Sequence, residues 1–168
     1  PGAGVAVEAA SPNNVALLKG RMKYQTIGPD KLNQLRHARM FRTVADIEKH
    51  MKRHAAILRP KFETVEKELQ NQLSGTGIAR WTTPRGGYFI SLYVLEGCAK
   101  RVEQLCANAG MILTPAGATY PYGNDPKDSN IRIAPSYPSV EEIEKASEVL
   151  ALAVRYAALE KLLADKEN

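Results

Sequence analysis

The sequence predicts an α/β (α+β) sandwich, a small and largely antiparallel sheet with helices packed against it. Apolar residues recur every three or four positions from Asp46 to about Leu73, and after "LSGTG" they recur every second position. The order from Asp46 onward is helix, two strands, helix, two strands or strand-like pieces, helix. A chain of 168 residues can form one domain with a proper core, or be a piece of something larger.

The first predicted helix, from Asp46 to about Leu73, is long and amphipathic. Pro60 interrupts its pattern. Because an interior proline removes a backbone donor and crowds the preceding turn, we expect a kink or a break into two helices there.

Two predicted strands, "IARWTT" and "GYFISLYV", are joined through "PRGG" and alternate in character. In the second, one face carries Tyr88, Ile90, Leu92 and Val94, and the other carries Phe89, Ser91 and Tyr93. Two later segments, "GMILT" and "NIRIA", read as further strands. Residues 1–10 suit a turn that enters a buried strand.

Cap signals mark the helix starts. A short helix is expected at about 15–20, and Asp30 lies near the start of another. The "SVEE" segment is a capping box formed by Ser139 and Glu142, and it opens a helix that runs to about Leu163.

Composition indicates a soluble globular protein, with 44% hydrophobic and 24% charged residues. No apolar run approaches the roughly 20 residues of a spanning helix, so no membrane segment is expected. Cys98 and Cys106 fall on one stripe of a predicted helix, which suits reduced core residues of a cytoplasmic protein. Since the chain opens on Pro1 without a leader pattern, we interpret that end as a fragment boundary.

The net charge of +5 is concentrated between Lys19 and Lys67, which raises the question of nucleic acid. These cations occupy helical sequence without interleaved aromatics and without zinc-finger spacing, so the pattern does not favour a nucleic-acid partner. It leaves a second hypothesis open: a stand-alone basic α/β module that binds nucleic acid or a small anionic ligand.

Two other patterns give no site. His50 and His54 have the i, i+4 spacing of metal ligands, but the neighbouring cations Lys49, Lys52 and Arg53 would repel a metal, so none is predicted. The "GAGVAV" segment lacks the last glycine of a dinucleotide loop.

Arg132 lies between Ile131 and Ile133 in "NIRIA", so a strand would direct it away from the isoleucines. One interpretation is a surface arginine, or one paired with Asp128. The other is a bidentate clamp for a carboxylate, to which a planar guanidinium on a rigid strand is suited.

Three motifs, "PRGGYF", "LTPAGATYPYG" and "NIRIAPSYPSVEEIEKA", occur in an order and spacing that resemble the small C-terminal domain of class I/II aminotransferases. These are fold type I enzymes that use pyridoxal 5'-phosphate. The segment "TIGPDKLNQLRHARMF" is similar to a bacterial aspartate-aminotransferase-like subgroup. The resemblance covers essentially the whole chain.

The resemblance implies that Arg132 binds the α-carboxylate of the substrate. It places the Schiff-base lysine upstream of Pro1, so no catalytic residue is expected in this chain, and pyridoxal phosphate would be bound by the full-length enzyme. Val5 stands where many members carry a phosphate-binding arginine, which leaves the cofactor contacts unknown. Arg21 and Lys23 are the nearest candidates for a cation that holds a side-chain carboxylate.

By the same resemblance, residues 1–20 are a remnant of the large cofactor domain, 21–45 an interdomain segment and 46–168 the small domain. The expected whole is a cytoplasmic homodimer that transfers an amino group between an amino acid, with aspartate as a candidate, and a 2-oxo acid. The large N-terminal domain of the same protein would be its partner, and the fragment alone would be inactive.

Overall fold

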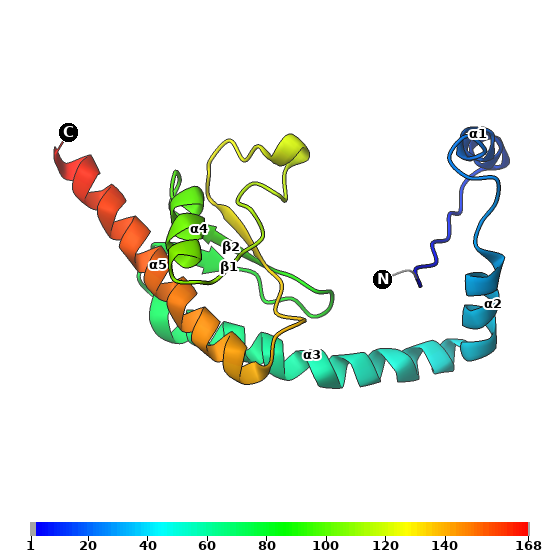
Figure 1. Cartoon of the computed structure of the whole chain (residues 1–168), viewed down its shortest axis with the longest axis horizontal. Helices are drawn as coiled ribbons and strands as arrows, with labels where there is room; N and C mark the ends of the chain where they lie inside the picture. Colours follow the sequence, from blue (N-terminus) through cyan, green and yellow to red (C-terminus); the bar gives the residue numbers. More distant parts are fainter. Residues whose placement is uncertain (1–2, 168) are drawn as a thin grey trace. The chain divides into compact units, whose positions relative to one another are not determined.

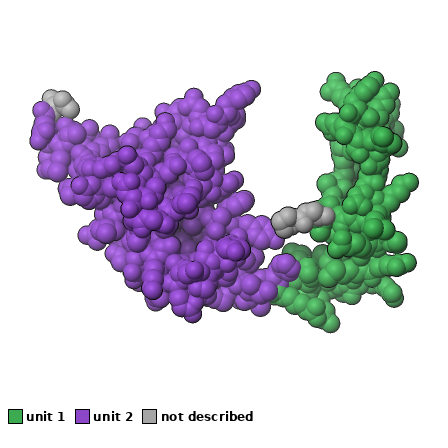
Figure 2. All heavy atoms as spheres, viewed as in Figure 1, with its two compact units in different colours: residues 1–53 green, residues 54–168 purple. Residues whose placement is uncertain are grey.

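The computed structural model describes residues 3–167 and divides the chain into two compact units, residues 1–53 and residues 54–168 (Figure 2). None of the described helices is both long and apolar enough to cross a membrane. The elements are labelled in Figure 1, and in chain order they are α1 (Pro12–Met22), α2 (Lys31–Met40), α3 (Val44–Leu73), β1 (Ala79–Trp81), β2 (Ile90–Val94), α4 (Ala99–Asn108), the 3-10 helix η1 (Pro121–Gly123), β3 (Asn130–Ile133) and α5 (Val140–Glu167).

The sheet has three strands in the order β1-β2-β3, and both pairs are antiparallel. In the register, Ile90 lies opposite Ile133 and Ser91 lies opposite Arg132. Directly opposed residues of antiparallel strands project from the same face of the sheet. A small antiparallel sheet with packed helices is therefore confirmed.

One face of the sheet is buried, because apolar residues alternate along β2 and β3. The last turns of α3, together with α4 and α5, contribute to the same core and cover this face. The largest fully buried side chains of this core are Val65, Leu69, Leu73, Ile90, Leu92, Val102, Cys106, Ile131 and Val154. Helices on one face leave the opposite, more polar face of the sheet for other contacts.

The predicted cap residues start their helices. Asp30 accepts a hydrogen bond from the backbone N–H of Asn33 (2.9 Å) at the start of α2. At α5 the Ser139 N–H donates to a Glu142 carboxylate oxygen (2.8 Å), and the Glu142 N–H donates to the Ser139 hydroxyl (3.2 Å). These polar sequence signals act locally, which is why they could be predicted.

Pro60 lies inside α3, which runs unbroken from Val44 to Leu73, so of the two expected outcomes, a kink or a break into two helices, the break is wrong. The proline removes one backbone donor but leaves its carbonyl available, and that oxygen accepts a hydrogen bond from the Thr64 hydroxyl (2.8 Å). The chain therefore stays helical through Pro60.

Two predicted strands are also absent from the described residues. Residues 111–115 have no regular structure: α4 ends at Asn108, Gly110 follows with a φ of +84°, and the Met111 N–H donates to the Cys106 carbonyl (2.9 Å). Residues 3–10 are irregular and exposed. Both segments are apolar enough for a strand, but neither pairs with a neighbouring strand.

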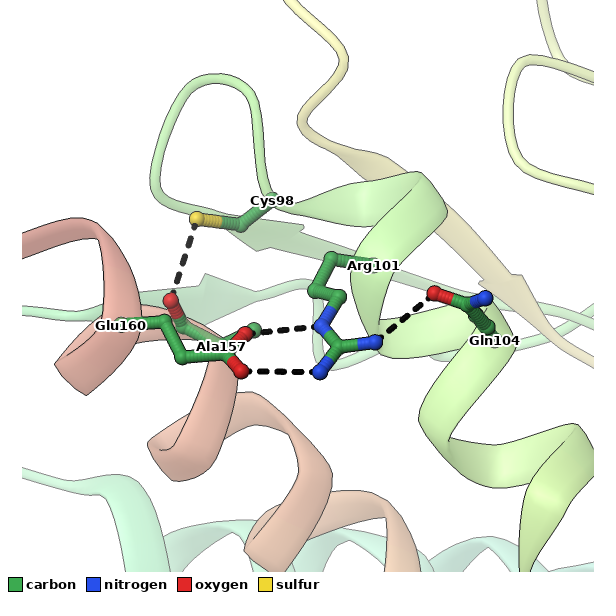
Figure 3. Close-up of polar contacts among 5 residues, drawn as sticks. All are labelled: Cys98, Arg101, Gln104, Ala157 and Glu160. Carbon is green, nitrogen blue, oxygen red and sulfur yellow. Dashed lines mark hydrogen bonds and ion pairs between the residues drawn. The ribbon is translucent and has the colours of Figure 1, made fainter.

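Helices α4 and α5 are joined by polar contacts at the edge of the core (Figure 3). The Arg101 guanidinium donates twice to the Glu160 carboxylate, at 2.7 and 2.8 Å, and once to Gln104 (2.7 Å). Its hydrogen bonds lower the pKa of Glu160 below the ordinary value. Because both side chains are more than one third exposed, this pair fixes the orientation of the helices more than it stabilises the fold.

The two cysteines are buried and free, as predicted for core residues. Burial raises the pKa of both thiols, that of Cys106 to about 11. Cys98 precedes α4 as its N-cap, and its sulfur lies 3.8 Å from the Ala157 carbonyl (Figure 3). Protonated, enclosed thiols are poor nucleophiles, which fits a structural role.

We expect the substitution Leu92→Ala to lower the free energy of unfolding by about 2–5 kcal/mol, because Leu92 is fully buried at the centre of the sheet and its removal leaves a cavity. Urea unfolding measures the change. The matched control is Leu152→Ala in α5, where the side chain is 66% exposed and the expected change is within about 0.5 kcal/mol. Equal effects of the two substitutions would contradict the assigned core.

Candidate functional site

Arg132 projects from the polar face of the sheet. Its neighbours Ile131 and Ile133 are 1% and 8% exposed and lie in the core, so the strand directs the arginine to the other face. Arg132 itself is half-buried. The predicted alternation of this strand is therefore confirmed.

The Arg132 guanidinium has an aromatic neighbour and no acceptor. Its carbon Cζ lies 4.6 Å from the centre of the Phe89 ring. Its Nε is buried without a hydrogen-bond partner, and no ion pair of the described residues includes this side chain. A buried donor without a partner costs about 1–3 kcal/mol. Because Nε lies out of reach of solvent, an anion would bind the two terminal nitrogens of the guanidinium.

The alternative pairing of Arg132 with Asp128 is not found. A carboxylate oxygen of Asp128 instead accepts a hydrogen bond from the backbone N–H of Lys100 (3.1 Å), in the first turn of α4. Asp128 also has a positive φ of 45°. The carboxylate nearest to Arg132 in sequence therefore caps a helix rather than neutralising the arginine.

A chain of side-chain hydrogen bonds runs beside Arg132 on the same face. The Thr119 hydroxyl donates to the Asn130 side-chain oxygen (2.6 Å), and the Asn130 amide donates to the Ser91 hydroxyl (2.8 Å). Ser91 is the residue directly opposite Arg132. The loop between α4 and β3 is thus attached to the two strands that position the arginine.

Asp125 organises the entry into β3. Its carboxylate accepts hydrogen bonds from the backbone N–H groups of Ser129 (2.8 Å), Asn130 (2.9 Å) and Lys127 (3.0 Å). Burial alone would raise the pKa of Asp125, but these backbone hydrogen bonds outweigh it and lower the pKa. An ionised Asp125 therefore fixes the start of the strand that carries Arg132.

The same loop contains a close backbone approach. Gly117 has φ +88°, and a Cβ at this position would lie 2.3 Å from the Gly123 carbonyl oxygen. Only glycine fits such a contact. The "PAGATYPYG" segment is consequently a structured loop, held at both of its glycines.

Lys61 supports the chain that follows Arg132. Its ammonium donates to the carbonyls of Ser136 (2.9 Å) and Tyr137 (3.3 Å), in the link between β3 and α5. Sequence reasoning missed Lys61, since nothing local marks a lysine as a partner of carbonyls 75 residues later. It also missed Phe89 as a neighbour of the arginine, although the shared alternation of Phe89 and Ser91 carried that signal.

The other predicted site residues lie in the unit of residues 1–53. Arg21 is exposed in the last turn of α1, and the Lys23 ammonium lies 5.0 Å from the centre of the Tyr24 ring. Val5 is 47% exposed. Roles for Arg21 and Lys23 in binding a carboxylate stay predictions.

The chemistry that the described residues support is anion binding. Residues 3–167 contain no group of three or more His, Cys, Asp and Glu side chains that could hold a metal. A hollow near the start of α4 is lined by Gly97, Lys100, Arg101, Glu103, Gln104, Ala107 and Asp128, and Arg132 does not line it. Arg132 therefore offers donors on an open sheet face rather than inside that hollow.

We expect Asp125→Asn to lower the free energy of unfolding at pH 7 by about 1–3 kcal/mol, because an amide oxygen replaces a charged acceptor of several N–H groups. Since the folded pKa of Asp125 is lowered, its contribution is present above the unfolded pKa near 4 and is lost as the pH falls through the folded pKa. The difference in the free energy of unfolding between the variant and the parent should therefore become smaller at acidic pH.

Urea unfolding at several pH values measures this difference. The control is Asp165→Asn, since Asp165 is exposed and forms only a 3.5 Å ion pair with Lys161 within α5. If the effect of Asp125→Asn on the free energy of unfolding did not depend on pH, an ionised Asp125 that accepts these backbone hydrogen bonds would be contradicted.

One protein family matches nearly the whole chain. The family described as aspartate amino-transferase matches residues 1–166. The chain is 46% identical over 159 residues to the aspartate aminotransferase of Corynebacterium glutamicum, which covers 95% of this chain and 37% of that protein. The chain therefore spans well under half the length of this curated relative.

Solved structures of aminotransferases match the fold of this chain. An aspartate transaminase of Corynebacterium glutamicum matches with a TM-score of 0.83 and 46% identity, over 90% of this chain and 36% of that one. The α-aminoadipate aminotransferase of Thermus thermophilus, solved with N-(5'-phosphopyridoxyl)-L-leucine, has the same fold at 17% identity, with a TM-score of 0.74 over 90% of this chain and 38% of that one. The chain belongs to the aspartate aminotransferase family, whose members are fold type I enzymes that use pyridoxal phosphate.

Proposed function

We propose that this chain is the C-terminal portion of an enzyme that transfers an amino group between an amino acid and a 2-oxo acid. Its membership of the aspartate aminotransferase family supports the reaction class. The 46% identity to an enzyme named aspartate aminotransferase supports aspartate as the amino donor.

In this proposal Arg132 binds the α-carboxylate of the substrate. The observation that carries it is the half-buried guanidinium, which forms no ion pair with any acid of the described residues. A guanidinium offers parallel N–H groups to the two oxygens of one carboxylate, and that bidentate contact fixes an angle as well as a position. Arg132 would thereby orient the amino acid so that its Cα–H bond is presented for proton removal.

The acidic residues before β3 and after β2 already have other partners. Asp125 and Asp128 are occupied by backbone N–H groups, and Glu96 pairs with Lys127. Carboxylates that already accept hydrogen bonds gain little from moving to another donor. An incoming carboxylate therefore meets an unneutralised arginine.

Pyridoxal phosphate, when bound, supplies the electron sink that amino-group transfer requires. The described residues provide a donor set that fits a substrate carboxylate, and we assign none of them to the cofactor. We place the Schiff-base lysine upstream of Pro1, so the isolated chain should be inactive. The open setting of Arg132 is consistent with a site that other parts of the protein complete.

The remaining assignments concern the whole protein. We propose that residues 1–20, 21–45 and 46–168 are a remnant of the large domain, an interdomain segment and the small domain, and that the enzyme is a homodimer. Arg21 or Lys23 would then hold a side-chain carboxylate of the substrate. The two buried free thiols support a cytoplasmic location.

We expect Arg132→Ala in the full-length enzyme to lower kcat/KM at least about 100-fold, because loss of the charged bidentate contact removes about 3 kcal/mol of transition-state stabilisation. Steady-state kinetics measure the loss, and cofactor absorbance should stay intact. The matched control is Arg80→Ala: Arg80 also stacks on an aromatic ring, that of Tyr93 at 3.9 Å, but is exposed. Unchanged kinetics of the Arg132 variant would refute its role.

Borohydride reduction of the full-length enzyme, followed by peptide mapping, should place the cofactor on a lysine outside residues 1–168. The chain itself offers exposed lysines as an internal control, among them Lys19 in α1. A pyridoxyl group found on any lysine of the present sequence would contradict the assignment of this chain as a portion without the Schiff-base residue.

A further inference from the structure

The aromatic ring under Arg132 comes from the strand beside it. Phe89 lies immediately before β2 and shares the face of Ser91, the residue opposite Arg132. Such a diagonal position lies within reach of an aromatic and a long side chain. The ring centre is 4.6 Å from the guanidinium carbon, which is a stacking distance.

The turn before Phe89 determines on which side the ring lies. Gly87 has φ +90°, a conformation that other residues adopt only with strain. The chain then enters β2 at Ile90, whose side chain is fully buried. Because side chains alternate along the strand, a buried Ile90 directs Phe89 to the face of Arg132.

Core packing does not explain the exposed ring. Phe89 is 49% exposed, whereas the core of this unit lies on the other face of the sheet. A large apolar side chain on a polar face gains little from burial. The Phe89 ring instead contacts the guanidinium of Arg132.

We infer that Phe89 is a positioning residue for Arg132, whose ring limits the positions of the guanidinium so that its outer N–H groups meet a substrate carboxylate. This inference rests on the proposed function of Arg132. A free arginine side chain loses rotamer entropy when it is fixed by a ligand. A guanidinium that already lies against a ring has less freedom to lose on binding, so the ligand binds more tightly.

The Nε atom of Arg132 is turned away from solvent. Nε is buried and has no acceptor, while the guanidinium covers the ring. The terminal nitrogens are then the donors left for a ligand, in the parallel geometry that a carboxylate prefers. Phe89 would act on the substrate only through Arg132, without touching it.

The test uses the full-length enzyme with its cofactor and compares Phe89→Leu with Phe89→Tyr. Leucine keeps an apolar side chain but removes the ring, so KM for the amino donor should rise about threefold to tenfold, with kcat changed less than twofold. Tyrosine keeps the ring and should restore the parent KM. Cofactor absorbance and the melting temperature should be the same in all three proteins.

The matched control is Tyr88→Leu, which removes the adjacent aromatic side chain at a similar exposure of 53%. It should leave KM within twofold. If Tyr88→Leu raises KM as much as Phe89→Leu does, or if Phe89→Leu leaves KM unchanged, the positioning role is wrong. Phe89→Met provides a second ring-free variant if the leucine variant folds poorly.

Arg132→Lys separates the two proposals. If lysine at 132 leaves KM at the parent value, the proposed function of Arg132 fails, whatever the Phe89 variants do. If Arg132→Lys raises KM, Phe89→Leu added to it should change KM by less than twofold, because no guanidinium remains to be positioned. Additive effects of the two substitutions would overturn the inference while leaving Arg132 in its role.

Discussion

The structure around the candidate site depends on one constraint, the two-residue period of β3. Ile131 and Ile133 occupy the core between the sheet and its helices, and so the backbone has no freedom to turn Arg132 inward. A shift of one residue in register would place a guanidinium in that core and two isoleucines in water. The cost of that exchange fixes the arginine on the polar face more firmly than any polar contact of its own.

The strand β3 must also be held in place, and side-chain hydrogen bonds to the backbone before and after it do this. Asp125 holds the N–H groups of Ser129 and Asn130, and Lys61 holds the carbonyls of Ser136 and Tyr137, so both ends of the short strand are anchored. A four-residue strand has few ladder bonds with which to resist fraying. Anchors at its two ends supply the rigidity that a directional arginine needs.

Sequence reasoning succeeded where the determining interaction is local. The alternation around Arg132 and the capping box of Ser139 and Glu142 both act within a few residues. Sequence reasoning failed where the local structure depends on residues far away in the chain. The apolar run 111–115 has the composition of a strand but pairs with none of the three strands of the sheet. The loop contacts of Asp125 and the carbonyl partners of Lys61 likewise have no local pattern.

The two stacked arginines on the polar face show why a cation over a ring is not by itself a site. Arg80 lies closer to its ring than Arg132 does, at 3.9 against 4.6 Å, yet it is exposed and can satisfy its donors with water. Arg132 is half-buried and has an Nε that water does not reach. A fold selected for stability alone would give that donor an acceptor, and Asp128 is close enough in sequence to have provided one. Its use as a helix cap instead leaves the charge of Arg132 without a partner among the described acidic side chains, and so available to a ligand.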